Sequence, residues 1–253
     1  MSAYFESLNR RTVPSSAAGK PAPSAPPATR VVRPVERPAV PPVVVTSGPS
    51  AAVTAAHYTA LRERLLASAN GRPLRVIVLA GCEGGEGTGQ IARDFAETLA
   101  TSGLKAMLLD AGVGHDGSAA GNDVVQLVAR ESTASAISVG KGQLAIVAGP
   151  SGLVDKENFY RSAEFASWLD RQRGFYDYVL IEAPPLVRFS DGALLGRLCD
   201  GVVIVVEAGA THRDALVRGR ELLERSDVKV IGAVLTRVRQ ELPAILRPFF
   251  PDE

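Results

Sequence analysis

Short apolar runs recur along the chain between residues 76 and 235. Within each run the apolar side chains are consecutive rather than alternating, which is typical of strands buried on both faces of a sheet. Such runs predict parallel strands, because crossover helices cover both faces of a parallel sheet. The expected strands are residues 76–80, 105–110, 144–148, 178–182, 201–207 and 228–235.

Segments with helical periodicity separate these runs. In residues 51–69, Tyr58, Leu61 and Leu65 recur on one side, as they do in an amphipathic helix. The alternation of strands and helices predicts an α/β domain over residues 51–253, with a parallel sheet flanked by helices on both faces. The expected helices are residues 51–69, 91–100, 123–129, 164–171, 191–198 and 213–225.

The first 50 residues follow a different pattern. Residues 1–12 favour a short helix with Tyr4 and Phe5 on one face, which could either dock to a partner or fray as a terminus. Residues 13–50 hold most of the prolines, and proline favours extended polyproline II over a packed core. We expect a disordered, proline-rich linker that acts as a spacer; a ligand for a proline-binding domain is the alternative.

The stretch between the first of these buried strands and the helix after it is rich in glycine, at positions 81, 84, 85, 87 and 89. A strand, a glycine-rich turn and a helix form the layout of a loop whose backbone N–H groups cradle phosphate. In nucleotide-binding loops the turn ends in Gly-Lys-Ser/Thr, where the lysine neutralises the phosphates and the hydroxyl holds Mg²⁺. Here Thr88 and Gly89 follow Gly87, so both chemical groups are replaced.

Two carboxylates, Asp110 and Glu182, end expected strands. Because ligands of such sheets bind at the carboxyl ends of the strands, we expect both beside the glycine-rich turn. They are the catalytic candidates if the chain is an enzyme, and Glu182 could hold Mg²⁺ through water. However, Glu83 and Glu86 place negative charge where phosphates would lie. The residues therefore favour a turn kept for folding, without nucleotide or metal, over weakened binding of ATP or ADP with Mg²⁺.

Composition narrows the classes of partner. The net charge of +1 gives no electrostatic reason to expect nucleic acid binding. Cys82 and Cys199 lie far apart in the sequence, and we expect them to stay reduced. No apolar run approaches the ~20 residues that span a bilayer, and the N-terminus lacks the pattern of a secretory signal. We expect a cytoplasmic protein that reaches a membrane only through a partner.

The order of these motifs resembles the cytoplasmic kinase module of the bacterial tyrosine kinases of capsule and exopolysaccharide synthesis, within the Min/Par-like branch of P-loop ATPases. The similarity runs over residues 55–237. The family's loop Pro-Gly-Glu-Gly-Lys-Ser-Thr reads Gly-Gly-Glu-Gly-Thr-Gly-Gln at residues 84–90. Its Tyr-Asp-Tyr-Val-Ile-Ile-Asp-x-Pro-Pro element reads Tyr-Asp-Tyr-Val-Leu-Ile-Glu-Ala-Pro-Pro at residues 176–185. Further family motifs fall at residues 56–62, 108–114, 199–206 and 232–236.

The resemblance implies a P-loop NTPase fold, ATP and Mg²⁺ as ligands, and autophosphorylation of C-terminal tyrosines. The family also packs its first helix against a neighbouring subunit's nucleotide site, which implies a homo-oligomer contact through Tyr58 and Arg62. The vestigial nucleotide-binding positions are Gly84, Gly85, Glu86, Gly87, Thr88, Gly89, Asp110, Glu182 and Asp191.

The sequence departs from the family at the residues that carry the chemistry. Thr88 replaces the lysine, Gly89 the metal-binding hydroxyl and Gly112 the second aspartate of its strand end. Glu182 replaces another aspartate, Thr236 an asparagine on the adenine side, and the C-terminal tail has no tyrosine.

Three functions remain open. The first is a non-catalytic, kinase-like scaffold or regulator of exopolysaccharide or capsule biosynthesis and export, docked to an inner-membrane polysaccharide co-polymerase or chain-length regulator. The second is a divergent, active ATPase or protein tyrosine kinase of the same pathway. The third is a Min/Par-like positioning protein. The concerted loss of site residues favours the first.

Overall fold

The computed structural model describes residues 43–44, 51–69, 71, 73–112, 122–150 and 153–238, and of residues 43–44 and 51–54 the backbone only. All of them lie in one compact unit, Pro38–Glu253. The helix expected at residues 1–12 lies outside the described residues, as does the expected linker apart from residues 43–44.

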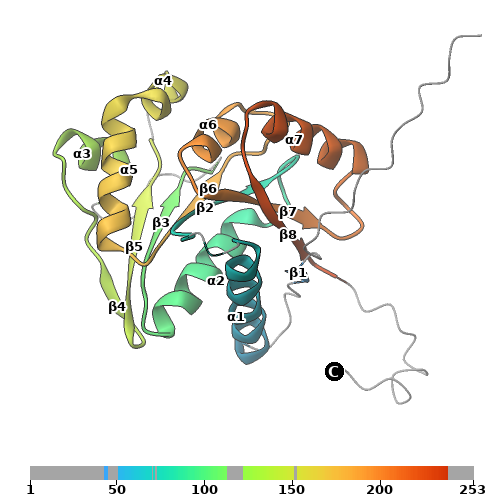
Figure 1. Ribbon diagram of the computed structural model, residues 1–253, viewed down its shortest axis with the longest axis horizontal. Helices are drawn as coiled ribbons and strands as arrows, with labels where there is room; N and C mark the ends of the chain where they lie inside the picture. Colours follow the sequence, from blue (N-terminus) through green and yellow to red (C-terminus); the bar gives the residue numbers. More distant parts are fainter. Residues whose placement is uncertain are drawn as a thin grey trace, which may run out of the picture. The chain divides into compact units, whose positions relative to one another are not determined.

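The core of this unit is a mostly parallel sheet with the strand order β1-β8-β7-β2-β6-β3-β5-β4 (Figure 1). Its strands are β1 (Val43–Val44), β2 (Val76–Gly81), β3 (Lys105–Asp110), β4 (Ile137–Val139), β5 (Gly142–Ala148), β6 (Tyr178–Ala183), β7 (Gly201–Glu207) and β8 (Val230–Thr236). The parallel sheet expected from the apolar runs is confirmed, since every neighbouring pair except β4 and β5 is parallel.

Both edges of the sheet differ from the expectation. β1 lies in the stretch expected to be a linker, yet Val43 pairs with Val234 of β8. At the other edge, β4 joins β5 by a tight turn in which Gly140 has a φ of +59°, a conformation that favours glycine. A turn this short can only return the chain antiparallel, because a parallel neighbour needs a crossover of a dozen or more residues.

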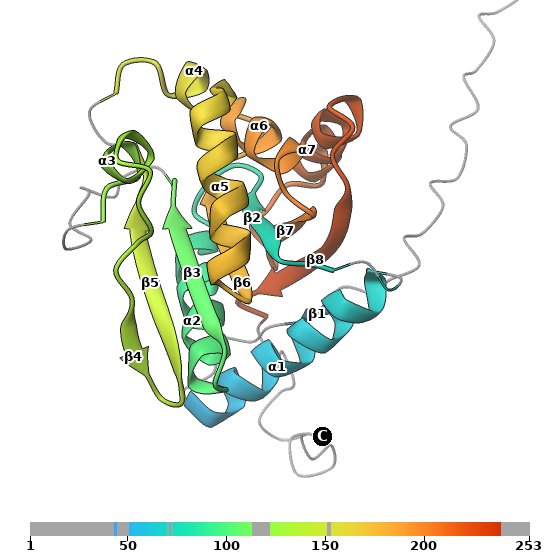
Figure 2. The same ribbon diagram turned by 60° about the vertical axis from the view of Figure 1, so that its left-hand side comes forward.

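Helices cover both faces of the sheet (Figures 1 and 2). They are α1 (Ala51–Ser68), α2 (Thr88–Thr101), α3 (Val124–Ala129), α4 (Lys156–Arg161), α5 (Ala163–Phe175), α6 (Asp191–Arg197) and α7 (Arg213–Arg225). α1 and α2 lie on one face, where Tyr58 and Phe95 join a buried apolar cluster. α3 to α7 lie on the other, around Phe165 and Trp168. Within the described ranges, no helix is long and apolar enough to cross a membrane.

The strand register brings the candidate site together. β2 lies between β6 and β7, so the glycine-rich turn that follows it starts beside the end of β6. Asp110 at the end of β3 is the register partner of Glu182 in β6. Two carboxylates far apart in sequence therefore become neighbours on adjacent strands, as expected for residues at the same edge of a parallel sheet.

Candidate functional site

A cleft of about 510 Å³ lies at the carboxyl edge of the sheet. Its walls are the glycine-rich turn, the first turn and a half of α2, and the segment that follows β6. Of the residues expected to bind nucleotide, those that line the cleft are Gly84, Gly85, Glu86, Gly87, Thr88, Gly89 and Glu182.

Two other expected site residues lie outside the wall of the cleft. Asp110 is buried beside Glu182, as its register partner on the neighbouring strand. Asp191 begins α6, where burial raises the pKa of its carboxyl group and Lys156 and Glu157 are its charged neighbours. The fold therefore brings the turn, Asp110 and Glu182 together, and places Asp191 beside α4.

The turn binds a carboxylate of its own. Glu86 is buried, and its carboxylate accepts hydrogen bonds from the backbone N–H groups of Cys82 at 2.9 Å, Glu83 at 2.7 Å and Gly84 at 2.8 Å. A Cβ atom on Gly81 would lie 2.6 Å from this carboxylate, so glycine is required there for the side chain to fold inward. Three N–H groups of the turn are thus satisfied by an internal anion.

The start of α2 lacks the charge that a phosphate loop supplies. Gly87 precedes the helix with a φ of +77°, and Thr88 and Gly89 are its first two residues. Of the described residues that line the cleft, none is a lysine. The Thr236 hydroxyl at the end of β8 donates a hydrogen bond to the Glu86 carbonyl oxygen at 3.0 Å. This bond connects the turn to β8.

Behind the turn, Asp110 and Glu182 form a buried carboxyl pair, with exposed fractions of 8% and 7%. Burial, then the charge and hydrogen bond of Asp110, raise the pKa of Glu182 to about 8, against an opposing effect of Arg93. Arg93 of α2 lies 3.7 Å from the Asp110 carboxylate. One proton and one guanidinium therefore hold this pair together.

The family resemblance implies Mg²⁺ as a ligand, but the side chains of this cleft do not fit it. Magnesium needs hard oxygen ligands around an open position. Here Gly89 offers no hydroxyl, and the Glu182 carboxylate lies 2.8 Å from where a Cβ atom of Gly89 would stand and 2.7 Å from that of Gly112. The described residues contain no cluster of three or more metal-ligating side chains.

Sequence reasoning missed three side chains that line the cleft: Arg93, Arg188 and Phe189. Arg93 had a signal, because it follows Gly89 by four residues and so lies on the same face of α2. Arg188 and Phe189 lie after β6 and before α6, where no periodicity marks them. Their place follows from two hydrogen bonds, from Leu186 N–H to the Gly81 carbonyl and from Val187 N–H to the Cys82 carbonyl.

The two residues expected at an oligomer contact have partners inside the chain. Tyr58 is 1% exposed, stacks on Phe95 and donates a hydrogen bond to Asp94 at 3.3 Å. The half-buried Arg62 donates to the Tyr178 hydroxyl at 3.4 Å. Tyr58 is therefore part of the core, and Arg62 alone of the two reaches the surface.

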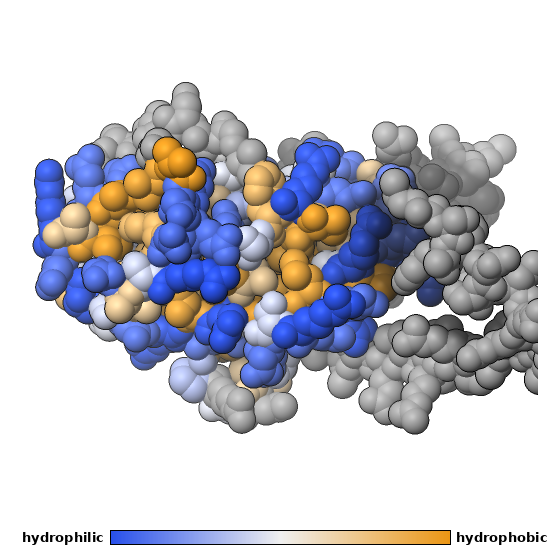
Figure 3. All heavy atoms as spheres, turned by 90° about the horizontal axis from the view of Figure 1, so that it is seen from above, coloured by the Kyte–Doolittle hydropathy of each residue, from blue (hydrophilic) through white to orange (hydrophobic). Residues whose placement is uncertain are grey.

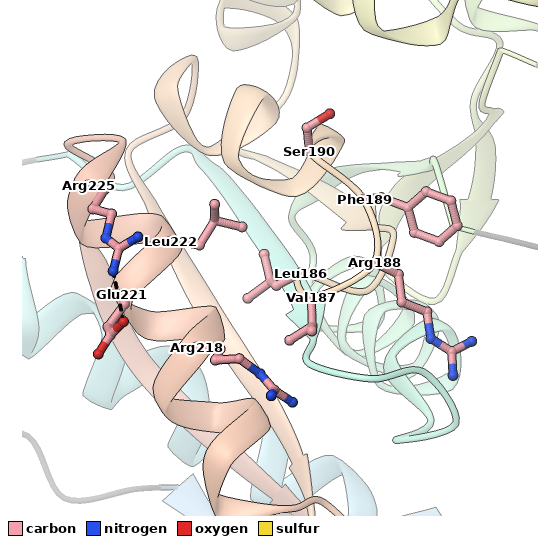
Figure 4. Close-up of a pocket in the computed structure, with 9 residues that line it drawn as sticks. All are labelled: Leu186, Val187, Arg188, Phe189, Ser190, Arg218, Glu221, Leu222 and Arg225. Carbon is pink, nitrogen blue, oxygen red and sulfur yellow. Dashed lines mark hydrogen bonds and ion pairs between the residues drawn. The ribbon is translucent and has the colours of Figure 1, made fainter. Parts of the chain in front are cut away.

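A second hollow of about 400 Å³ lies between α7 and the segment before α6; we call it the α7 groove. Figure 4 shows Leu186, Val187 and Leu222 at its centre, with Arg188 and Arg218 extending beside them. On this side of the molecule hydrophobic residues are exposed between hydrophilic ones (Figure 3). Arg188 and Phe189 line both this groove and the cleft.

Comparison with known sequences finds bacterial tyrosine kinases. Tyrosine-protein kinase CpsD of Streptococcus agalactiae is 23% identical over 206 residues, which cover 75% of this chain and 86% of CpsD. Succinoglycan biosynthesis transport protein ExoP of Rhizobium meliloti is 30% identical over 181 residues, which cover 66% of this chain and 23% of ExoP. No protein-family model matches the chain.

Solved structures share the fold. The chimerical protein CapA2B2 aligns with a TM-score of 0.69 and 22% identity, over 79% of this chain and 96% of that chain. The kinase domain of Escherichia coli tyrosine kinase ETK aligns with a TM-score of 0.66 and 19% identity, over 76% of this chain and 78% of that chain. A chain of the MinC:MinD cell division protein complex of Aquifex aeolicus aligns with a TM-score of 0.53 and 18% identity, over 69% of this chain and 72% of that chain. The expected P-loop NTPase-like fold is confirmed.

Proposed function

We propose that this chain, a relative of the bacterial tyrosine-protein kinases of capsule and exopolysaccharide synthesis, acts as a non-catalytic, kinase-like scaffold or regulator in such a pathway. The observation that supports the proposal is the position of the Glu182 carboxyl group, which lies against Gly89 and Gly112, two positions where the family resemblance implies residues of the nucleotide and metal site. CpsD and ExoP, by their names a tyrosine-protein kinase and a succinoglycan biosynthesis transport protein, support the pathway.

The physical reason is electrostatic. Phosphoryl transfer is driven by cations that stabilise charge on the transferred phosphoryl group, chiefly a lysine and Mg²⁺. In this cleft Thr88 is uncharged, while Glu86 and Glu182 add carboxyl groups within the wall. Arg93 is the nearest cation to the buried pair and is already engaged by Asp110. The cleft therefore lacks the lysine and the metal-binding hydroxyl on which phosphoryl transfer depends, and its other arginine, Arg188, lies on the segment after β6 rather than on the phosphate-binding turn.

A scaffold needs a binding surface, and we assign that role to the α7 groove. Arginines flank the apolar centre of the groove. Arg225 forms an ion pair with Glu221 at 3.0 Å. Among the described residues, neither Arg188 nor Arg218 forms an ion pair of this kind. This charge fits an acidic segment with apolar anchors. We propose that the cytoplasmic part of an inner-membrane polysaccharide co-polymerase supplies that segment, which would hold this chain at the membrane from the cytoplasmic side.

The test is to titrate the purified protein with ATP, with and without Mg²⁺, by isothermal calorimetry, and to follow transfer of labelled phosphate to protein tyrosine. We expect no Mg²⁺-dependent heat at millimolar ATP and no labelled protein. Asp110→Asn serves as the control variant for any residual signal. Micromolar, Mg²⁺-dependent binding, or phosphate transfer that Asp110→Asn abolishes, would contradict the proposal and favour a divergent kinase or ATPase.

A further inference from the structure

We propose that Gly89, Gly112 and Glu182 form one coupled unit, in which the Glu182 carboxyl group fills the position of a metal ion and its hydroxyl ligand and so excludes Mg²⁺ from the cleft. The inference deepens the proposed function, because it names the residue that closes the site. It would make the three substitutions one structural change rather than three separate losses.

The geometry of the two glycines carries the inference. A Cβ atom at Gly89 would lie 2.8 Å and 2.9 Å from the two Glu182 carboxylate oxygens. A Cβ atom at Gly112 would lie 2.7 Å from one of the same oxygens. Neither glycine has a positive φ in this structure, so backbone conformation does not demand glycine at these positions. A side chain at either position would instead meet the Glu182 carboxyl group, which lies between the two glycines.

The carboxyl group has little freedom to leave this position. Glu182 is 7% exposed, and its backbone carbonyl is fixed by a hydrogen bond from Ala111 N–H at 3.0 Å. Gly89 and Gly112 both lie against its carboxyl group, and its register partner on the neighbouring strand is the buried Asp110. A cation in this space would therefore have to displace a side chain that the surrounding backbone holds.

The length of the side chain decides the outcome. Aspartate at position 182 would be one methylene shorter, about 1.5 Å, and would withdraw the carboxyl group from both glycines. Glutamine would keep the length but could not lose a proton to become a metal-binding carboxylate. Comparing these two variants separates filling of space from loss of a metal ligand.

The first experiment rebuilds the site. We compare Thr88→Lys/Gly89→Ser with the triple variant that adds Glu182→Asp, and measure binding of ADP by calorimetry with and without Mg²⁺. We expect Mg²⁺ to leave the affinity of the double variant unchanged and to raise that of the triple variant at least tenfold. The matched control adds Glu182→Gln instead, and should behave as the double variant. A Mg²⁺ effect of equal size in the double and triple variants would overturn the inference.

The second experiment reads the coupling from stability and needs no ligand. We introduce Gly89→Ala and Gly112→Ala, each alone and both together, into the wild-type protein and into the Glu182→Asp variant. The melting temperature of every variant is then measured by thermal unfolding. A single alanine can push the carboxyl group toward the other glycine, so each costs little. The two alanines together leave no room for the carboxyl group. We therefore expect the double variant to lose several degrees more in melting temperature than the sum of the two single losses. In the Glu182→Asp background the losses in melting temperature should be additive. Additive losses in both backgrounds would refute the coupling of Gly89, Gly112 and Glu182.

The two proposals can fail separately. Additive alanine losses would remove the role of Glu182, while Thr88 would still explain an inactive protein. Conversely, ATP turnover by the wild-type protein would end the scaffold proposal, whereas the alanine cycle would still report whether positions 89, 112 and 182 are coupled.

Discussion

Glu86 and Glu182 show how single side chains occupy a phosphate-loop cleft from within. The Glu86 carboxylate accepts three N–H groups of the turn, and the Glu182 carboxyl group lies between two glycines at the start of α2 and after β3. Buried carboxyl groups are costly unless they are paired or protonated. Glu86 is satisfied by N–H donors, and Glu182 by a shared proton with Asp110. The raised pKa of Glu182 makes the stability of the fold sensitive to pH at this residue.

The raised pKa of Glu182 predicts that stability falls as pH rises. Folding moves its pKa from the ordinary 4.5 to about 8, because burial and then Asp110 raise the pKa more than Arg93 lowers it. Between these values the folded state binds more protons than the unfolded state, so the contribution is fully present below pH 4.5 and is lost as pH rises through 8. We expect the free energy of unfolding to decrease by up to about 1.4 kcal/mol per pH unit.

Denaturant unfolding between pH 5 and pH 8.5 checks this slope. Glu182→Gln should flatten it, because the amide does not titrate, and should be more stable than wild type at the alkaline end. Glu221→Gln, on the surface of α7, is the matched control and should keep the wild-type slope. An unchanged slope in Glu182→Gln would show that other groups cause the pH dependence.

At the scale of the elements, Asp200, in the connection between α6 and β7, joins β2 to α5 at the amino edge of the sheet. It lies between α6 and β7, and its carboxylate accepts the N–H groups of Arg75 and Val76, each at 2.7 Å. The same carboxylate pairs with Arg173 of α5 at 2.7 Å, and Arg173 also donates to the Leu198 carbonyl at 2.8 Å. One aspartate therefore fixes the start of β2 against α5, which sets the position of the turn at its far end.

Asp200→Ala should destabilise the fold by about 2–4 kcal/mol, because it leaves two backbone donors and a guanidinium without their acceptor. Chemical denaturation measures the loss, and Asp200→Asn should recover part of it. Asp170→Ala is the matched control: Asp170 also pairs with Arg173, at 3.2 Å, but its side chain is 76% exposed. We expect less than about 0.5 kcal/mol there. Equal losses in the two alanine variants would contradict a special role for Asp200.

At the scale of the whole molecule, the cleft and the α7 groove share a wall. Arg188 and Phe189 line both, and the exposed fractions of Phe189 and of Val217 on α7 are 41% and 45%. The segment that carries them is tied to the glycine-rich turn by backbone hydrogen bonds. A partner bound in the groove would therefore contact the rim of the cleft directly.

Charge reversal tests the groove as the docking surface. Arg188→Glu/Arg218→Glu should reduce binding to the full-length co-polymerase of the same pathway, reconstituted in nanodiscs, at least tenfold. Surface plasmon resonance measures the affinity, and raised salt should weaken wild-type binding. Arg197→Glu, exposed on α6 outside the groove, is the control. Retained affinity in the double variant would place the contact elsewhere.

The fold was predictable from the sequence where the signal was long and local. Consecutive apolar runs such as residues 178–182 are enough to define buried parallel strands, and β6 covers Tyr178–Ala183. Edge strands were not predictable in this way. β1 and β4 hold two and three residues, too few for a period to appear, and β1 exists only because β8 offers it a partner.

By itself the sequence determined which groups are missing from the site, because Thr88 and Gly89 stand at fixed spacing in a recognisable loop. It also placed Asp110 and Glu182 at one sheet edge. Only the tertiary structure decided what occupies the space: the register of β3 and β6 sets Glu182 against Gly112, and the packing of α2 sets it against Gly89. Contacts between residues so distant in sequence depend on how the strands pair, which no local pattern encodes.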